Sequence, residues 1–291
     1  MNDEKTYCPI CHSSDIQPSH PETNPAYCYC RACKTAFQLS IADTSESPPA
    51  VSYNEEYFRP WEAGPHGLEL TRTSKSLSFD SWLNEFEQFQ RPGKLLDIGC
   101  AMGFFLDRAK IRGLNGFGVE ISSYASQIAQ RNHGTQVLCG TLAQSSFPKE
   151  FFQAITLLDV LEHLPDPVQT IKTLSALLCN GGHIMISTPN LLSLSSNLLG
   201  TRWFQRKPEH TMLFSPRSLQ YLLKKCGLKL LLLRPALKWV TLEFLESYFQ
   251  EYAPAPVKDL STTFFRMIPS RLRTAPLRLG TGEMLAIARK Q

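Results

Sequence analysis

The stretch that most constrains the fold is KLLDIGCAMGFFL, at residues 94–106. Its first part, KLLDI, is a short apolar run with an acid, Asp97, near its end, and it predicts a buried strand. Two glycines, Gly99 and Gly103, follow, and apolar residues then recur at helical spacing. A strand, a glycine turn and a helix in this order let the backbone approach a ligand, with helix N–H groups facing it.

A second acid stands at the corresponding place one strand–helix unit later. Gly116–Val119 is predicted as the next strand, and Glu120 follows it directly. An acid at that place can hold the two hydroxyls of a ribose. The dinucleotide pattern G-x-G-x-x-G is not present, because Ala101 and Phe104 occupy two of its glycine positions. A pyrophosphate site is therefore not predicted.

Length, charge and cysteine content limit the class of protein. A chain of 291 residues can hold one large α/β domain and a small unit beside it. The net charge of +4 is too mild for a dedicated nucleic-acid binder. The first residues, MNDEKTYCPIC, contain no apolar signal core, and no run of about 18 apolar residues predicts a membrane span. The cysteine usage fits a reducing compartment, so we expect a cytoplasmic protein.

Two C-x-x-C pairs predict a zinc ribbon in residues 1–40. The pairs are Cys8 with Cys11, and Cys30 with Cys33. Each pair places two thiolates on one tight turn, and four thiolates suit a tetrahedral, structural zinc ion without an open position for catalysis. Few apolar residues accompany them, so the metal is expected to supply the folding energy.

Three other residues of this unit could compete as metal ligands. Cys28 lies two residues before the second pair. His12 and His20 are weaker candidates, because they are expected in exposed turns.

Residues 41–75 are predicted to be a linker followed by an aromatic arm. The segment YNEEYF, Tyr53–Phe58, either covers the ligand expected at the glycine turn or fixes the arm to the core. After it, Ser76–Phe89 has apolar residues at a helical period.

From residue 76 to the end, the pattern predicts an alternation of strands and helices. A helix is expected at Ser122–Asn132, with Ser122 as its N-cap. The other predicted elements are strands at Gln136–Cys139, Phe151–Leu158, His183–Ser187, Leu228–Arg234 and Glu283–Ala288, a helix at Val168–Leu178 and a turn at Cys179–Gly182.

The last two predicted strands are expected to form an antiparallel pair with residues 235–279 inserted between them. The insert combines an amphipathic helix, Val240–Tyr252, with a basic aromatic tract, Phe264–Arg278. It could cover the substrate, form a dimer or touch a membrane surface as a peripheral contact.

The turn D-x-G-x-x-x-G at residues 97–103 resembles motif I of the class I S-adenosylmethionine-dependent methyltransferases, with Ala101 in place of the middle glycine. The block DVLEHLPDP–helix–NGG–HIMISTPN, residues 159–190, resembles the same region of ubiquinone-biosynthesis-type O-methyltransferases. With the ribbon included, the chain resembles bacterial zinc-ribbon methyltransferases, among them sugar C-methyltransferases. This resemblance implies an α/β, Rossmann-like fold with a seven-stranded sheet.

The resemblance also implies which residues bind S-adenosylmethionine. Asp97 and Gly99 would hold its methionine end, Glu120 would hold the ribose, and Asp159 would line it at a strand end. The adenine contact is open, because Thr141 stands where the family often has an acid. The full set implied is Asp97, Gly99, Cys100, Gly103, Glu120, Ile121, Thr141, Asp159 and Val160.

Two histidines are the candidate bases of the reaction. His163 follows Glu162 after a predicted strand, and His210 lies in a long loop. A neutral imidazole can accept a proton near pH 7. In the resembling quinone enzymes an acid–histidine pair at this place helps to hold a divalent ion, and Asp159, Glu162 and His163 could do the same. Either histidine could instead be structural.

Two main classes of function remain open from the sequence. The first is methyl transfer to O or C of a small molecule: a sugar, quinone, polyketide or lipid-linked intermediate. The alternative is an RNA or protein methyltransferase that uses the ribbon for recognition. The ribbon has few basic residues (Lys5, Arg31 and Lys34), which makes a nucleic-acid partner the weaker expectation. A catalytically silent scaffold is a third reading.

Overall fold

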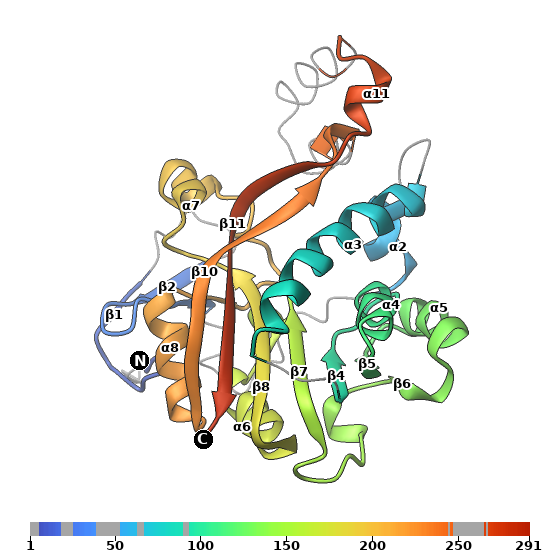
Figure 1. Ribbon diagram of the computed structural model, residues 1–291. Helices are drawn as coiled ribbons and strands as arrows, with labels where there is room; N and C mark the ends of the chain where they lie inside the picture. Colours follow the sequence, from blue (N-terminus) through green and yellow to red (C-terminus); the bar gives the residue numbers. More distant parts are fainter. Residues whose placement is uncertain are drawn as a thin grey trace.

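The structure is a computed structural model that describes residues 6–18, 26–38, 53–62, 67–89, 93–243, 245–246, 265 and 267–291. Its larger sheet has seven strands among these residues. In spatial order they are β10 (Leu228–Val240), β11 (Leu277–Lys290), β8 (Leu178–Pro189), β7 (Phe152–Leu158), β4 (Lys94–Ile98), β5 (Asn115–Glu120) and β6 (Val137–Cys139). Strands β8, β7, β4, β5 and β6 run parallel, and β11 is antiparallel to both neighbours. This is the predicted Rossmann-like α/β sheet (Figure 1).

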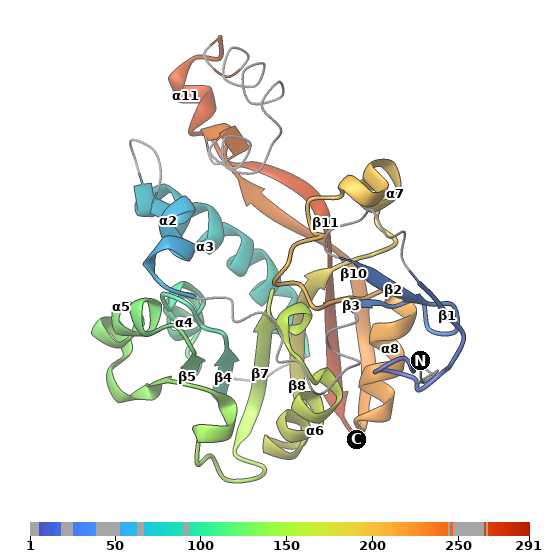
Figure 2. The same ribbon diagram turned by 180° about the vertical axis from the view of Figure 1, so that it is seen from behind.

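Successive strand residues point to opposite faces of this sheet, and each face has its own helices. Leu95 packs in one hydrophobic cluster with α3 (Gly67–Phe86), α4 (Phe104–Ile111) and α5 (Ser123–His133). Its neighbour Leu96 packs in another, with α6 (Pro167–Leu177) and α8 (Pro216–Lys225). The two opposite views in Figures 1 and 2 show the sheet between these layers. The carboxyl ends of the parallel strands therefore lie at one common edge.

Local signals fix several helix starts. The Ser122 hydroxyl accepts a hydrogen bond from the Ala125 N–H at 3.2 Å, as predicted for the cap of α5. Asp166 caps α6 by accepting from the Gln169 N–H at 2.9 Å. A capping side chain satisfies an N–H group that has no partner inside the helix.

Two predicted boundaries were wrong in the first and middle parts of the chain. Helix α3 begins at Gly67 rather than Ser76, and its first turns contact α2 (Glu55–Glu62), a helix that includes part of the YNEEYF segment. The predicted turn at Cys179–Gly182 lies within β8. The strand passes through it because Gly181 adopts a positive φ of 74°, and the pairing with β7 shifts register there.

The last two strands are longer than predicted. They form the expected antiparallel pair, but β10 continues to Val240 and β11 already begins at Leu277. Pro235 does not end β10 because this strand is at the edge of the sheet, where a missing N–H is tolerated. The segment between the strands is therefore shorter at both ends than residues 235–279.

Most of that inserted segment lies outside the described residues. This includes most of the predicted helix at Val240–Tyr252 and the first part of the tract Phe264–Arg278. A short helix, α11 (Ser270–Arg273), falls within the described part of the tract. No helix among the described residues is long and apolar enough to cross a membrane.

The smaller sheet joins the ribbon to the rest of the chain. Its order is β1 (Ile16–Gln17), β2 (Tyr27–Cys30), β3 (Ala36–Gln38) and β9 (Met212–Leu213). Strand β9 belongs to the segment that follows β8, so the ribbon hairpin pairs directly with the larger domain. Cys8, Ile10 and Phe37 also pack in the same hydrophobic cluster as Phe214 and Leu219. The ribbon therefore shares its core with the domain. Figure 2 shows its strands beside α8.

Candidate active site and metal centre

The turn after β4 is held in a conformation that few side chains tolerate. Gly99, Ala101 and Gly103 have φ values of 68°, 46° and 83°. Ala101 is the unusual member, because a residue with a Cβ is disfavoured there by roughly 1–2 kcal/mol. Its N–H donates to Glu120 Oε2 at 2.8 Å, a charge-assisted bond that helps to keep the backbone in place.

Gly99 has a second restriction besides its φ. A Cβ at this position would lie 2.5 Å from Val160 Cγ2. The glycine thus lets the end of β4 approach the residue that follows β7, and two of the predicted cofactor residues, Gly99 and Val160, are brought into contact.

We expect Gly99→Ala to lower the free energy of unfolding by roughly 3 kcal/mol, because it adds a clash to an unfavourable backbone conformation. Gly113→Ala is the matched control: its φ is 76° and nothing lies within 4 Å of the added Cβ. It should cost only about 1–2 kcal/mol. Urea unfolding measures both values. Equal losses for the two variants would contradict the contact with Val160.

Glu120 connects three segments at the carboxyl edge. It is 6% exposed, and its two oxygens accept from the N–H groups of Ala101 at 2.8 Å and Ser122 at 2.7 Å. Burial raises its pKa, and these backbone donors lower it. Each carboxylate oxygen has a second acceptor position. The side chain can therefore hold the glycine turn and still accept from ligand hydroxyls.

Asp97 lies on the neighbouring strand but turns toward β7. It is 2% exposed and accepts from Thr156 Oγ1 at 2.6 Å. Burial raises the pKa of Asp97 to about 7; the Thr156 bond lowers it and the charge of Glu120 raises it. The acid thus links two parallel strands just before the glycine turn.

Three other predicted cofactor residues differ from one another in the exposure and contacts of their side chains. The Cys100 side chain is buried in the core cluster beside α4, so only its backbone could contact a ligand at this edge. Ile121 is 57% exposed. Thr141 is exposed, and its N–H and hydroxyl both donate to Gln144 Oε1, at 2.7 and 3.2 Å.

Asp159 belongs to a group that we call the lysine–carboxylate cluster: Lys75, Asp159, Lys238 and Glu283. Lys238 Nζ lies 2.7 Å from Asp159 Oδ2 and 3.1 Å from Glu283 Oε1. Burial opposes ionisation of Asp159, but Lys238 outweighs it and lowers the pKa to about 2. Burial also lowers the pKa of Lys238, and the two carboxylates raise it above its ordinary value. This pair is therefore charged.

Lys75 differs from Lys238 in its partners. Its ammonium lies 3.9 Å from the centre of the Trp61 ring, and it makes no hydrogen bond or ion pair within the described chain. Burial lowers its pKa to about 8, while the charge of Asp159 raises it. Lys75, Lys238 and Glu283 were not predicted as site residues. Lys75 fell at the end of the predicted linker and arm, Lys238 in the predicted insert, and Glu283 at the start of the last predicted strand.

The two candidate bases lie together. His163 ends the short helix η3 (Leu161–His163), and its ring centre is 4.7 Å from that of His210, at an angle of 87°. Burial lowers the pKa of His163 to about 4 and that of His210 well below its ordinary value. Both imidazoles are therefore neutral at pH 7.

Backbone carbonyl groups bear on which nitrogen of each imidazole ring carries the proton. His163 Nδ1 lies 3.0 Å from the Glu209 carbonyl, and His210 Nδ1 lies 2.7 Å from the Gln205 carbonyl. A carbonyl only accepts, so these two contacts favour the form in which Nδ1 carries the proton and Nε2 keeps a lone pair. Tyr53, at the start of the aromatic arm, contacts His163 Nδ1 through its hydroxyl at 3.2 Å. The arm thus lies against this pair.

An acid also lies beside the histidines. Ligand atoms of Glu162, His163 and His210 lie within 4.8 Å of one another. Asp159 was expected to lie with Glu162 and His163, but it forms an ion pair with Lys238. Burial raises the pKa of Glu162 to about 8, and the charge of Asp159 raises it too.

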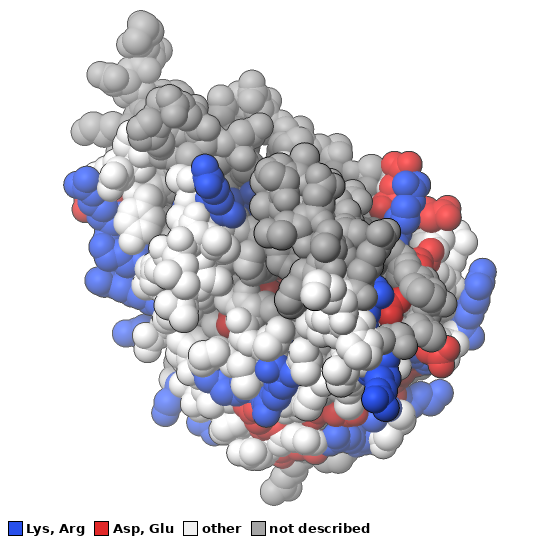
Figure 3. All heavy atoms as spheres, turned by 90° about the horizontal axis from the view of Figure 1, so that it is seen from above, with Lys and Arg blue, Asp and Glu red and all other residues white. Residues whose placement is uncertain are grey.

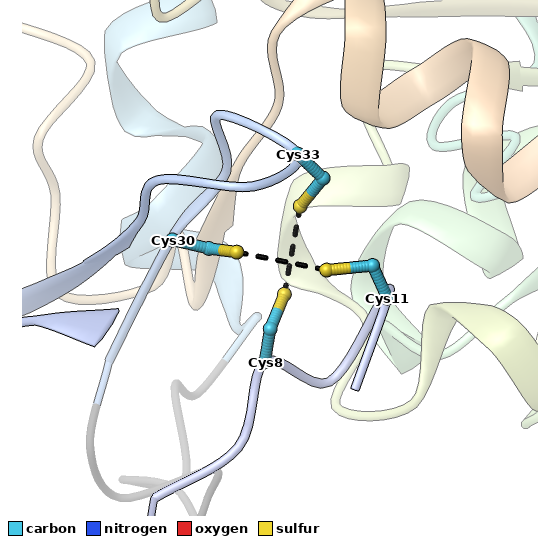
Figure 4. A group of neighbouring side chains, drawn as sticks. All are labelled: Cys8, Cys11, Cys30 and Cys33. Atoms are coloured by element: carbon cyan, nitrogen blue, oxygen red, sulfur yellow. Dashed lines mark hydrogen bonds between the residues drawn. The ribbon is translucent and has the colours of Figure 1, made fainter. Parts of the chain in front are cut away.

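The four predicted zinc ligands converge on one point (Figure 4). Cys8 Sγ lies 3.6 Å from Cys33 Sγ, and Cys11 Sγ lies 3.6 Å from Cys30 Sγ. Sulfur atoms at the corners of a tetrahedral zinc site, each about 2.3 Å from the metal, lie roughly 3.8 Å apart. A disulfide would need a separation of about 2 Å. The donor set and its spacing therefore fit zinc.

The rival ligands are not part of this cluster. Cys28 is buried on β2, and the group of converging ligand atoms consists of the other four ribbon thiols. His12 is exposed, and His20 lies outside the described residues.

Comparison with known proteins identifies the family. A methyltransferase domain model matches residues 73–233, more than half of the chain. The ubiquinone biosynthesis O-methyltransferase of Alkalilimnicola ehrlichii is 34% identical over 106 residues, which cover 33% of this chain and 42% of that protein. The enzyme of the same name from Nitrosomonas europaea is 24% identical over 147 residues, covering 46% and 63%. The chain spans about half the length of the curated relatives it matches.

Solved structures agree on the fold. A SAM dependent methyltransferase from Archaeoglobus fulgidus aligns with a TM-score of 0.50 at 19% identity, covering 81% of this chain and 98% of that one. The YcgJ protein from Bacillus subtilis aligns with a TM-score of 0.52 at 16% identity, covering 74% and 98%. The chain therefore belongs to the methyltransferase domain family, as a member of the class I S-adenosylmethionine-dependent methyltransferases.

Proposed function

We propose that the protein transfers a methyl group from S-adenosylmethionine to an oxygen or carbon atom of a small molecule. The observation that carries this proposal is the arrangement at Glu120, whose buried carboxylate holds the turn of residues 99–103 and keeps acceptor capacity for a ribose diol. Gly99, Gly103, Val160 and Asp159 are the other proposed cofactor residues around that turn. The relatives named as O-methyltransferases support an oxygen as acceptor.

His163 and His210 have properties that suit a role in binding and deprotonating the methyl acceptor. When bound, the cofactor supplies a methyl group that is already activated, so the protein need not form a covalent intermediate. Its tasks are to align the acceptor and to take up the proton that the acceptor loses. His163 and His210 each offer a neutral Nε2 lone pair for that proton. We assign them the role of base.

Burial and surface charge support a small acceptor. Glu162, His210 and Glu283 are 1%, 4% and 6% exposed, so these polar groups face the interior rather than a broad surface. Seen from above, Lys and Arg predominate along the left edge of the coloured surface, and they alternate with Asp and Glu over its lower part (Figure 3). The lower part does not offer the continuous basic surface typical of nucleic-acid binding.

The test is a transfer assay that follows formation of S-adenosylhomocysteine. Catechols, hydroxyquinols, nucleotide sugars and bulk RNA would be offered separately to the purified protein. We expect turnover with one of the small-molecule classes. Turnover with RNA and with none of the small-molecule classes would overturn the proposal.

We also propose that Cys8, Cys11, Cys30 and Cys33 hold a structural zinc ion. The metal would contribute folding energy to a hairpin that has few apolar residues of its own. It has four protein ligands and takes no part in the transfer.

Lys75 leads to a prediction about ligand charge. As an ammonium group without an ion-pair partner in the described chain, it should bind an anionic group, either the amino-acid carboxylate of the cofactor or an anionic acceptor. We expect Lys75→Met to weaken that binding by roughly tenfold or more. A weaker complex with S-adenosylhomocysteine but not with 5′-methylthioadenosine identifies the carboxylate, and a raised KM for the acceptor alone identifies the acceptor.

The pH dependence of wild-type binding checks the same assignment. Because the pKa of Lys75 is lowered to about 8, the cation is lost as pH rises through that value, and affinity should fall above pH 8. Asp159, Lys238 and Glu283 face the same amine. The pKa of Asp159 is lowered and that of Lys238 is raised, so these two groups keep their charges at pH 8. Lys94→Met is the control, because Lys94 lies 3.7 Å over the Phe151 ring, at the start of β4. Unchanged affinity and KM in Lys75→Met would refute the assignment.

A further inference from the structure

The ribbon is fastened to the segment that carries one of the candidate bases. We call residues 205–211 the histidine loop; it leads into β9, which pairs with β3 of the ribbon. Both metal-binding turns are also fixed from the domain side. Ser215 Oγ donates to the Cys33 carbonyl at 3.1 Å, and Lys225 Nζ donates to the Ile10 carbonyl at 3.0 Å. The ribbon is therefore joined to the domain next to the histidine loop by a strand pairing and by two side-chain hydrogen bonds.

Two buried side chains of the ribbon hold this loop directly. The Tyr27 hydroxyl, on β2, donates to the His210 carbonyl at 2.6 Å. The Gln38 amide, on β3, donates to the carbonyls of Pro208 at 2.9 Å and His210 at 3.0 Å. Tyr27 and Gln38 are 2% and 7% exposed, so water does not readily replace these bonds.

The loop in turn fixes the two imidazoles. The Glu209 carbonyl accepts from His163 Nδ1, and the Gln205 carbonyl accepts from His210 Nδ1. At the end of the histidine loop, Thr211 Oγ1 donates to the Glu162 carbonyl at 3.1 Å. A shift of the loop would remove the carbonyls that keep the proton on each Nδ1. Either ring could then present a protonated Nε2, which cannot accept a proton from the acceptor.

We propose that Tyr27 and Gln38 are positioning residues of the transfer reaction, through which the ribbon keeps His163 and His210 in the form with Nε2 unprotonated. The inference rests on the proposed function, because it assigns the pair to the acceptor. It gives the ribbon a role inside the domain: it supports the base, and it need not recruit a substrate.

The experiment that tests this proposal uses Tyr27→Phe and Gln38→Met in the zinc-loaded chain of residues 1–291. Tyr29→Phe is the control, since Tyr29 lies on the same strand and its hydroxyl makes no hydrogen bond with the described residues. Zinc content and affinity for S-adenosylhomocysteine should stay within about twofold of wild type in all three, because neither site is touched. These two readouts identify a variant that has simply lost its fold.

The decisive readout is the ring-nitrogen spectrum of the histidines, measured by long-range ¹H–¹⁵N NMR with His163→Gln and His210→Gln for assignment. In wild type and Tyr29→Phe, both rings should show a protonated Nδ1. In Tyr27→Phe and Gln38→Met, at least one ring should shift toward the other tautomer, and kcat should fall by roughly tenfold or more with KM for S-adenosylmethionine unchanged.

The experiment distinguishes a failure of the positioning role from a failure of the proposed function. If wild type binds S-adenosylhomocysteine and turns over, but both variants keep the wild-type tautomers and kcat, the positioning role is wrong. If wild type neither binds this ligand nor turns over, the proposed function has failed and the inference falls with it.

Discussion

Glu120→Ala is expected to weaken the binding of S-adenosylhomocysteine by roughly a hundredfold or more. The carboxylate is the acid that we assign to the ribose, and hydrogen bonds from ligand hydroxyls to a charged acceptor contribute about 1.5–3 kcal/mol. The same side chain accepts from the N–H groups of Ala101 and Ser122. Its removal therefore also leaves the left-handed conformation of Ala101 without the bond that holds it.

Glu120→Gln separates these two effects. The amide keeps the size of the side chain but turns one oxygen into a donor, which would face the N–H group of Ala101 or Ser122. We expect a loss of affinity similar to that of Glu120→Ala, with less damage to stability. Glu150→Ala is the control, because Glu150 is exposed and forms a surface ion pair with Lys290 at 3.3 Å. Its affinity should equal that of wild type.

Calorimetric titration gives these affinities, and circular dichroism checks that each variant is folded. A folded Glu120→Ala that binds S-adenosylhomocysteine within about threefold of wild type, a difference of only about 0.7 kcal/mol, would refute the role of Glu120.

Cys33→Ser is expected to remove the metal and to destabilise more than the ribbon. Structural zinc sites supply apparent binding energies of about 10–16 kcal/mol in small peptides. The ribbon shares a sheet with β9 and a hydrophobic cluster with α8, so its loss exposes apolar surface of the domain. We expect the melting temperature to fall by roughly 10 °C or more.

Zinc content and thermal melting measure this effect. Cys8→Ser should behave in the same way as Cys33→Ser, whereas the exposed Cys139→Ser should keep its zinc and its melting temperature. Cys28→Ser tests the rival ligand and should also keep zinc, because Cys28 is outside the converging set. Full zinc content in Cys33→Ser, or zinc loss in Cys28→Ser, would contradict the assignment of the ligands.

The parts of the fold that the sequence predicted correctly depend on local signals. The strand, glycine turn and helix at residues 94–111 follow from neighbouring residues, and the Ser122 cap is a local hydrogen bond. Glu120 could be placed because parallel strands end at one edge. The four cysteines could be grouped because their spacing carries the chemistry.

The features that the sequence could not reveal depend on distant segments. His163 and His210 meet because β9 pairs with β3 of the ribbon, a contact that no periodicity indicates. Lys238 reaches Asp159 because β10 continues past Pro235, a residue that ordinarily ends a strand. The tolerance comes from the place of β10 at the sheet edge, which is a property of the assembled topology.

The most direct test of the account is a calorimetric titration of the wild-type, zinc-loaded protein with S-adenosylhomocysteine. We predict one molecule bound per chain with a micromolar Kd. Adenosine diphosphate should not compete, because the turn lacks the dinucleotide glycine pattern. No binding by a folded protein, at millimolar ligand, would contradict the assignment of the turn, Glu120 and the proposed transfer together.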